Sequence, residues 1–367
     1  MKILQIGKFP PMQGGISTKT YWLYKQLEKD GFEYRVITNE DRYYSITDYE
    51  HDESKVTVVK EKKIPWHIPG SNLLDDRLIN VALKVANNFT PDLIETNYLW
   101  PFCKDALFVA QYLSKPLLIR HAGSDILKFH KDEEFLDIIS NYLNQAAAIA
   151  TNISSVNLLG DICRNNSKIR CIPRYIPNPS IFKPEKLAKQ YDILFAGKIN
   201  YHWHLKGLKL LIELIEQKKL KAFFLIGGRY AEEFRQQIAE KNLGIDINIC
   251  GFVTPDKMPT IYNSCKFVWC WEEEGGIEDF SNIIWEAVFC DTPCILNSIL
   301  SDKIEAEGTG KNFAHLLYHF DEQKLAAFDF NQTPCNSIEN FDTKTNLYNK
   351  YIKSNKDLYQ SVVGVQQ

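Results

Sequence analysis

Two glutamates stand eight positions apart in the second half of the chain, with a short polar segment between them. An N-cap at Ser281 or Asp279 would leave Glu278 in a loop and place Glu286 about one turn inside the helix that follows. Backbone N–H groups at the start of such a helix, near 280–282, suit a diphosphate or a sugar hydroxyl. Carboxylates accept hydrogen bonds from vicinal hydroxyls such as those of ribose. The spacing therefore predicts a site for a nucleotide or a sugar.

A pair of glutamates at this spacing also occurs on ordinary polar helices. The neighbours of Glu286 therefore decide between a binding site and a solvated helix face. The residues around it are apolar, namely Ile283, Ile284, Trp285, Ala287 and Val288. Because an unpaired buried carboxylate is costly, we expect a polar ligand at Glu286.

Two lysines frame another predicted strand-to-helix junction. Lys198 follows Gly197 at a strand end, and Lys206 precedes Gly207 where a helix begins. Together they would supply the point charges that a diphosphate needs. Each lysine alone is equally well explained as solvated, so this prediction depends on the pair.

The first half of the chain offers weaker signals. Gly14 and Gly15 separate the first predicted strand from a helix, where glycines let the backbone approach an anion or simply form a turn. His121 lies at a strand end, where a lone histidine is more often structural than catalytic. The aromatic side chains of 95–101 either stack on a sugar or pack under the loop.

The elements that must position these residues alternate between short apolar runs and helical patterns, which is typical of parallel sheets covered by helices. The pattern occurs twice, and four prolines between positions 173 and 184 separate the halves. Such α/β sheets bind ligands beyond the carboxyl ends of their strands. The predicted strands are 2–6, 34–38, 56–60, 92–96, 116–121, 147–151 and 168–172 in the first half and 191–197, 222–226, 247–251, 267–271 and 293–297 in the second.

Bulk composition excludes several classes of protein. The 367 residues suffice for two ordinary domains, and a net charge of -3 gives no sign of a nucleic-acid partner. The N-terminus lacks a signal peptide and no segment is apolar for long enough to span a bilayer, so we expect a cytoplasmic protein. The basic run 60–63 leaves peripheral contact with the inner membrane face open. The scattered cysteines and the pair His315 and His319 lack zinc-site spacing, so no metal is expected.

The motif Glu278-x7-Glu286-Ala287, followed by Asp291-Thr-Pro293, resembles the signature of retaining GT-B glycosyltransferases of family four, the glycosyl transferases group 1. The resemblance implies a GT-B fold, in which two Rossmann-like domains face each other across a cleft. It implies an acceptor-side domain at 1–175, a donor domain at 176–340 and a helical segment at 341–367 that packs back on the first domain. The other motifs in the family's order are Gly14-Gly15, Ile176-Pro-Asn178, Gly197-Lys198, Lys206-Gly207, Ile226-Gly-Gly228 and Gly251-Phe-Val253.

The same resemblance implies a role for each candidate residue. Glu278 and His121 would act at the reacting sugar, and Glu286 would bind the donor ribose. Lys198, where the family usually has arginine, and Lys206 would hold the diphosphate. The other implied donor-binding residues are Gly14, Gly15, Val253, Phe280, Ser281 and Asn282.

The implied reaction transfers a sugar from a nucleotide-diphosphate donor to a glycan or lipid-linked acceptor with retention, in surface polysaccharide biosynthesis. No cofactor or metal is implied, and no Asp-x-Asp metal motif is evident. A nucleotide-sugar epimerase or phosphorylase is one alternative. A catalytically silent sugar-nucleotide-binding protein is another, because Lys198 and the acidic run 272–274 depart from the usual pattern. A nicotinamide dehydrogenase is disfavoured, since no G-x-G-x-x-G follows the first strand.

Overall fold

The chain folds as two compact units. The computed structural model describes residues 1–40, 45–46, 50–60, 75–121, 125–126, 133–199, 206–241, 247–274, 281–331 and 341–364. Within these ranges, unit 1 contains the residues up to 175 together with 349–364, and unit 2 contains those from 176 to 348.

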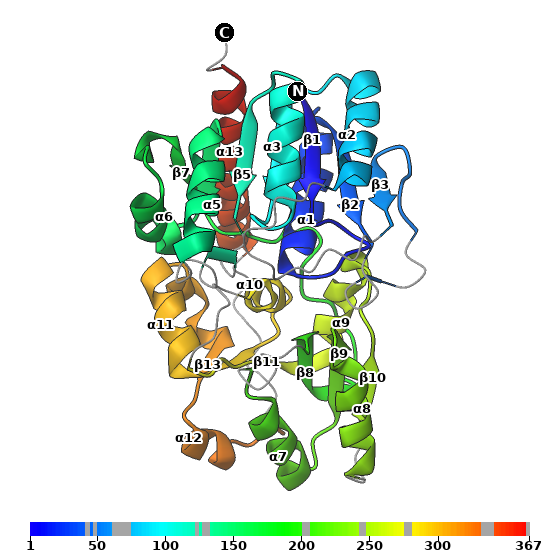
Figure 1. Ribbon diagram of the computed structural model, residues 1–367. Helices are drawn as coiled ribbons and strands as arrows, with labels where there is room; N and C mark the ends of the chain where they lie inside the picture. Colours follow the sequence, from blue (N-terminus) through cyan, green and yellow to red (C-terminus); the bar gives the residue numbers. More distant parts are fainter. Residues whose placement is uncertain are drawn as a thin grey trace. The chain divides into compact units, whose positions relative to one another are not determined.

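Unit 1 is built on a seven-stranded sheet in the order β3-β2-β1-β4-β5-β6-β7, and every strand pairing is parallel (Figure 1). The strands are β1 Lys2–Gly7, β2 Glu33–Asn39, β3 Val56–Val59, β4 Leu93–Asn97, β5 Leu117–Arg120, β6 Ala148–Thr151 and β7 Ile169–Cys171. The described helices of this unit are α1 Gly15–Lys29, α2 Asp76–Phe89, α3 Phe102–Tyr112, α5 Glu133–Gln145 and α6 Val156–Ile162.

Unit 2 repeats this plan with a six-stranded parallel sheet in the order β10-β9-β8-β11-β12-β13. Its strands are β8 Tyr191–Lys198, β9 Ala222–Gly227, β10 Ile247–Cys250, β11 Cys265–Cys270, β12 Cys294–Leu296 and β13 Leu317–His319. Its helices are α7 Leu208–Lys218, α8 Ala231–Glu240, α9 Met258–Ser264, α10 Asn282–Phe289, α11 Ser298–Glu307 and α12 Glu322–Ala327.

Both strand orders reverse direction next to the first strand of their unit. In unit 1 the reversal falls between β1 and β4, where Gly7 lies opposite Asn97, and in unit 2 it falls between β8 and β11. Ligands of doubly wound sheets bind at these switch points, beyond the carboxyl ends of the strands. The predicted fold class, with two Rossmann-like parallel-sheet units, is confirmed.

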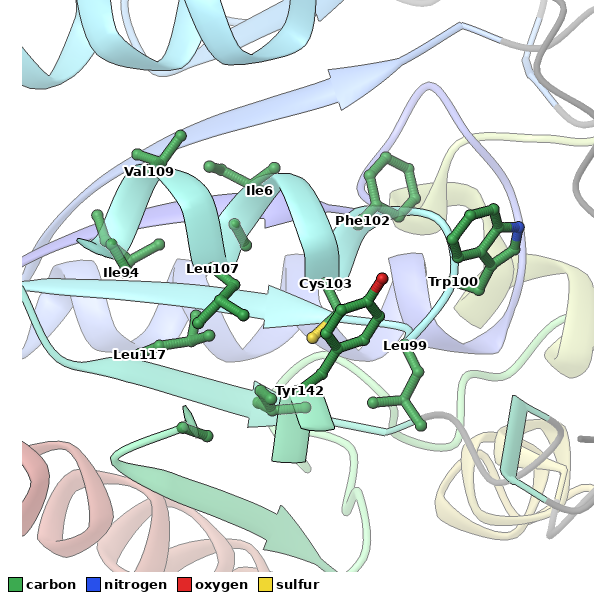
Figure 2. Packing of buried hydrophobic residues seen from close by; sticks show 14 of the residues in the cluster. Ile6, Ile94, Leu99, Trp100, Phe102, Cys103, Leu107, Val109, Leu117 and Tyr142 are labelled. Atoms are coloured by element: carbon green, nitrogen blue, oxygen red, sulfur yellow. The ribbon is translucent and has the colours of Figure 1, made fainter. Parts of the chain in front are cut away.

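The central strands of unit 1 are continuous apolar runs in the sequence because they lie in its buried core. Ile6 of β1 and Ile94 of β4 are fully buried, and Val109 on α3 belongs to the same cluster (Figure 2). Figure 2 also shows Leu99 and Trp100 in this cluster, just before α3 begins. A sheet with helices packed against it buries both faces of its strands, so polar positions on those strands need local partners.

One such polar cluster lies inside unit 1. Glu95 of β4 accepts a hydrogen bond from Arg120 Nε of β5 at 3.1 Å, and the guanidinium carbon of Arg120 lies 5.1 Å from the ring centroid of Tyr359. Tyr359 belongs to α13, Phe341–Gly364, which is drawn in red in Figure 1. Residues 341–348 of this helix belong to unit 2 and 349–364 to unit 1.

Candidate functional site

The carboxyl end of β8 is joined to the loop after β9. Lys198 pairs in register with Gly227, and the next residue, Ile199, donates its N–H to the Gly227 carbonyl at 2.7 Å. The ring of Phe252 lies directly over Gly227, because a Cβ there would be 2.2 Å from Phe252 Cε2. Val253, the predicted base-contacting residue, follows this ring and is half-buried. Gly227 therefore has to be glycine for this loop to take its position.

Lys206 lies at the same edge of the sheet. Its ammonium nitrogen lies 3.7 Å from the position that a Cβ on Gly197 would take. Its carbonyl accepts a hydrogen bond from Trp269 Nε1 at 3.0 Å. Gly207 then takes a left-handed conformation with φ 60°, and a Cβ there would be 2.4 Å from Cδ1 of Trp271. The structure thus brings Lys206 to the end of the strand that carries Lys198.

The helix α10 begins at Asn282, and Ser281 occupies its N-cap position with extended backbone angles. The hydroxyl of Ser281 makes no capping hydrogen bond, so it does not cap the helix in the way that the sequence suggested. Glu278 and Phe280 lie outside the described residues, and so does Asp279, the alternative cap.

Glu286 lies on α10 with only 2% of its surface exposed. Its Oε2 accepts a hydrogen bond from the hydroxyl of Tyr262, on α9, at 2.8 Å. Burial raises the pKa of Tyr262 well above its usual value, and the neighbouring Glu286 carboxylate raises this pKa further. A polar ligand was expected at Glu286, and the structure shows that a side chain of the protein itself already contacts this carboxylate. Sequence reasoning missed Tyr262, because only tertiary packing brings together residues 24 positions apart.

At the switch point of unit 1, the side chain of Asn97 holds the chain as it leaves β1. Its Oδ1 accepts the N–H of Lys8 at 2.6 Å, and its Nδ2 donates to the carbonyl of Lys8 at 2.9 Å and to Thr20 Oγ1 at 3.0 Å. A Cβ on Gly7 would lie 2.4 Å from Asn97 Oδ1, so this contact requires glycine. The ammonium of Lys8 lies 3.4 Å from the ring centroid of Tyr98, a cation–π contact. The sequence pattern did not single out Asn97 or Lys8.

The predicted glycine loop lies between this point and α1. Gly14 is the N-cap of α1 with φ 136°, a backbone conformation that favours glycine, and Gly15 is the first residue of the helix. The carbonyl of Gly14 accepts the N–H of Thr18 at 3.0 Å, the first bond of the helix.

His121 follows β5 and is 6% exposed. Its Nε2 lies 2.6 Å from Thr151 Oγ1, and that hydroxyl in turn donates to the carbonyl of Asn152 at 3.3 Å. The side chain of His121 is therefore held by a short hydrogen bond inside unit 1. Trp100, one of the aromatic residues of 95–101, is 2% exposed and makes an edge contact with Phe135, so its side chain packs in the core of unit 1.

The candidate residues divide between the units. Unit 1 contains Gly14, Gly15 and His121, and unit 2 contains Lys198, Lys206, Val253, Ser281, Asn282 and Glu286. Among the residues that the structure describes, no three His, Cys, Asp or Glu side chains are grouped to hold a metal ion. Within the same ranges, no helix combines the length and apolar character needed to cross a bilayer.

Comparison with known proteins agrees with this architecture. Residues 178–309 match the family model of the glycosyl transferases group 1. No curated protein matches the chain in sequence. Among solved structures, Anabaena HepE in complex with UDP and glucose is 16% identical, with a TM-score of 0.66 over 99% of this chain and 100% of that one.

Two further solved structures have similar scores. Sucrose-phosphate synthase from Thermosynechococcus elongatus is 15% identical, with a TM-score of 0.60 over 100% of this chain and 97% of that one. A glycosyltransferase from Rickettsia africae is 15% identical, with a TM-score of 0.62 over 99% and 98%. The chain therefore has the fold of the GT-B glycosyltransferases, and its second unit contains the segment that matches glycosyl transferases group 1.

Proposed function

We propose that this protein is a retaining glycosyltransferase that moves a sugar from a nucleotide-diphosphate donor to a hydroxyl of a glycan or lipid-linked acceptor, in surface polysaccharide biosynthesis. The observation that carries the proposal is the edge of unit 2, where Lys198 and Lys206 flank the end of β8 within the segment that matches the family model. The likeness to HepE, whose structures contain UDP and UDP-glucose, supports a nucleotide-sugar donor.

In this proposal the residues of unit 2 bind the donor. Lys198 and Lys206 stabilise the charge that grows on the departing diphosphate, together with the N–H groups of 281–282 at the start of α10. The carboxylate of Glu286 accepts hydrogen bonds from the ribose, and the backbone of Val253 contacts the base. The two lysines and the helix terminus supply this positive charge without a metal ion.

The remaining predicted site residues, from the glycine loop, the end of β5 and the segment before α10, act on the sugar side of the donor. Gly14 and Gly15 present backbone N–H groups to the donor, and His121 acts at the reacting sugar with Glu278. Phe280 lines the donor sugar. The acceptor hydroxyl attacks the anomeric carbon from the face that the nucleotide leaves, which retains the configuration.

Thermal-shift screening against UDP, GDP, ADP and their sugars tests donor binding, because a ligand that binds the native state raises the melting temperature. We expect one nucleotide sugar to stabilise the wild type and Glu286→Gln to remove most of that shift. Glu213→Gln, an exposed change on α7, is the matched control and should keep the full shift. A protein that no nucleotide stabilises would contradict the proposal.

Transfer is then measured with the donor that binds. NMR should detect a free nucleoside diphosphate and a new glycoside with the anomeric configuration of the donor. Isomerisation of the nucleotide sugar without an acceptor would instead identify an epimerase. Binding without turnover across a broad acceptor panel would identify a silent binding protein.

A further inference from the structure

Tyr262 is the buried residue that contacts the proposed ribose-binding carboxylate. It lies on α9 with none of its surface exposed, and its hydroxyl donates to Glu286 Oε2 at 2.8 Å. The raised pKa of Tyr262 keeps this hydroxyl protonated, so it remains a donor at any physiological pH. Its ring also lies 6.5 Å from that of Phe182, centroid to centroid.

The backbone of α9 is fixed from two sides. The carbonyl of Tyr262 accepts a hydrogen bond from Thr292 Oγ1 at 2.9 Å, and Thr292 is fully buried. The next residue, Asn263, accepts the N–H of Glu185 at 2.8 Å and donates to the carbonyl of Lys183 at 2.9 Å. The phenol therefore projects from a backbone that several side-chain hydrogen bonds hold in place.

The helix that carries Glu286 is fixed at its other end. The ammonium of Lys344 donates to the carbonyl of Phe289, the last residue of α10, at 3.1 Å. The same ammonium lies 2.6 Å from Asp291 Oδ1. A cation at a helix C-terminus interacts favourably with the helix dipole. The hydroxyl of Tyr262 therefore meets Glu286 Oε2 between two helices that are each held by side-chain hydrogen bonds.

We propose that Tyr262 is a positioning residue for donor binding, whose hydroxyl fixes one oxygen of the Glu286 carboxylate and so orients that carboxylate toward the ribose hydroxyls of the nucleotide. The inference rests on the proposed function. The terminal torsion of a glutamate side chain is broad, so an unheld carboxylate would sample many orientations. A carboxylate held in one orientation meets two vicinal hydroxyls at a smaller entropic cost.

Tyr262→Phe removes the hydroxyl and keeps the ring. Because the ribose is remote from the reacting bond, we expect the donor KM to rise about tenfold while kcat changes less than about twofold. The preference for a ribonucleotide over its 2′-deoxy and 3′-deoxy analogues should fall by a similar factor. A residue that only stabilises the fold would not change this preference.

The test is calorimetric titration of the best-binding nucleoside diphosphate and its two deoxy analogues into four proteins. These are the wild type, Tyr262→Phe, Glu286→Gln and the double variant. We expect each single variant to lose about tenfold in ribose preference and the double variant to lose no more than Glu286→Gln alone. Tyr318→Phe, a half-buried tyrosine on β13, is the matched control and should keep the preference.

The outcomes separate the two proposals. A Tyr262→Phe variant with a lower melting temperature but an unchanged ribose preference would overturn the positioning role. An unchanged preference in Glu286→Gln, with nucleotide still bound, would overturn it as well while leaving a glycosyltransferase in place. A wild type that binds no nucleotide would overturn both proposals.

Discussion

Arg120 and Glu95 form an ion pair inside unit 1, with 3.1 Å between Nε and Oε1 and side-chain exposures of only 10% and 0%. Breaking such a pair by removing one partner leaves an uncompensated buried charge, whereas replacing both partners by apolar residues is often nearly neutral. The pair is therefore a sensitive point for the stability of this unit.

Arg120→Leu should lower the free energy of unfolding of unit 1 by about 3–5 kcal/mol, because Glu95 would stay buried without its partner. The double variant Arg120→Leu/Glu95→Leu should recover most of this loss. Urea unfolding followed by circular dichroism measures both. The control is Lys353→Ala, which breaks an exposed pair with Asp357 and should cost less than about 0.5 kcal/mol. Equal losses in Arg120→Leu and in the control would contradict the prediction.

Gly227→Ala should weaken nucleotide binding, because the new Cβ would lie 2.2 Å from Phe252 and push this ring and the adjacent Val253 out of place. Gly251→Ala is the matched control, since its Cβ would meet nothing within 4 Å. We expect a loss of affinity of about tenfold or more in the first variant and little change in the second. Calorimetric titration with the best-binding nucleotide distinguishes them, and equal affinities would show that Phe252 moves without consequence.

Lys206→Ala should weaken binding of a nucleoside diphosphate by about tenfold, because the variant loses a charge-assisted contact with the phosphates. The corresponding nucleoside should bind equally to variant and wild type. Lys209→Ala, an exposed lysine on α7, is the control and should leave both affinities unchanged. If Lys206→Ala binds the diphosphate as the wild type does, its ammonium is not a phosphate ligand.

The stability of the fold should fall steeply at alkaline pH. Burial raises the pKa of the Cys163 and Cys265 thiols from 9.0 to about 11, and it raises the pKa of Tyr359 well above 10.0. These groups stay protonated in the fold and ionise in the unfolded chain. Their contribution to the free energy of unfolding is therefore complete below pH 9 and is lost as the pH rises through the pKa values of these groups in the folded protein.

Urea midpoints measured between pH 7 and 11 check this dependence. We expect these groups to leave the urea midpoint nearly unchanged up to pH 9 and to lower it above pH 9. In Cys265→Ala the midpoint should fall less steeply with pH, because one ionising group is gone. A midpoint that stays constant to pH 11 would be inconsistent with buried thiols and phenols of this kind.

The sequence predicted the sheets well, because their strands are continuous apolar runs between turn signals. The predicted strand 191–197 corresponds to β8, Tyr191–Lys198. The short strand β13, Leu317–His319, was missed because three residues with only one buried position carry no period-2 signal.

Side-chain contacts were predicted less well than strands. The contact of Tyr262 with Glu286 depends on how α9 packs against α10, which no local pattern shows. The argument from burial at Glu286 predicted a polar ligand, whereas the contact that the structure shows is with the side chain of Tyr262. Burial alone could not tell a ligand from another side chain. Likewise, nothing in the pattern around Asn97 distinguishes a residue that clamps Lys8 from one on an ordinary strand end.

The division of α13 between the units has a consequence for the order in which this protein is made. Lys356 pairs with Asp30 at 3.2 Å, and Tyr359 packs on Arg120, so residues synthesised after unit 2 complete a unit whose other residues are synthesised before it. During translation, residues 1–175 emerge before unit 2, and the helical residues 349–364 that complete unit 1 emerge only after unit 2. A circular permutant that moves 349–364 ahead of Met1 would remove that delay and allow unit 1 to fold as one continuous stretch of chain.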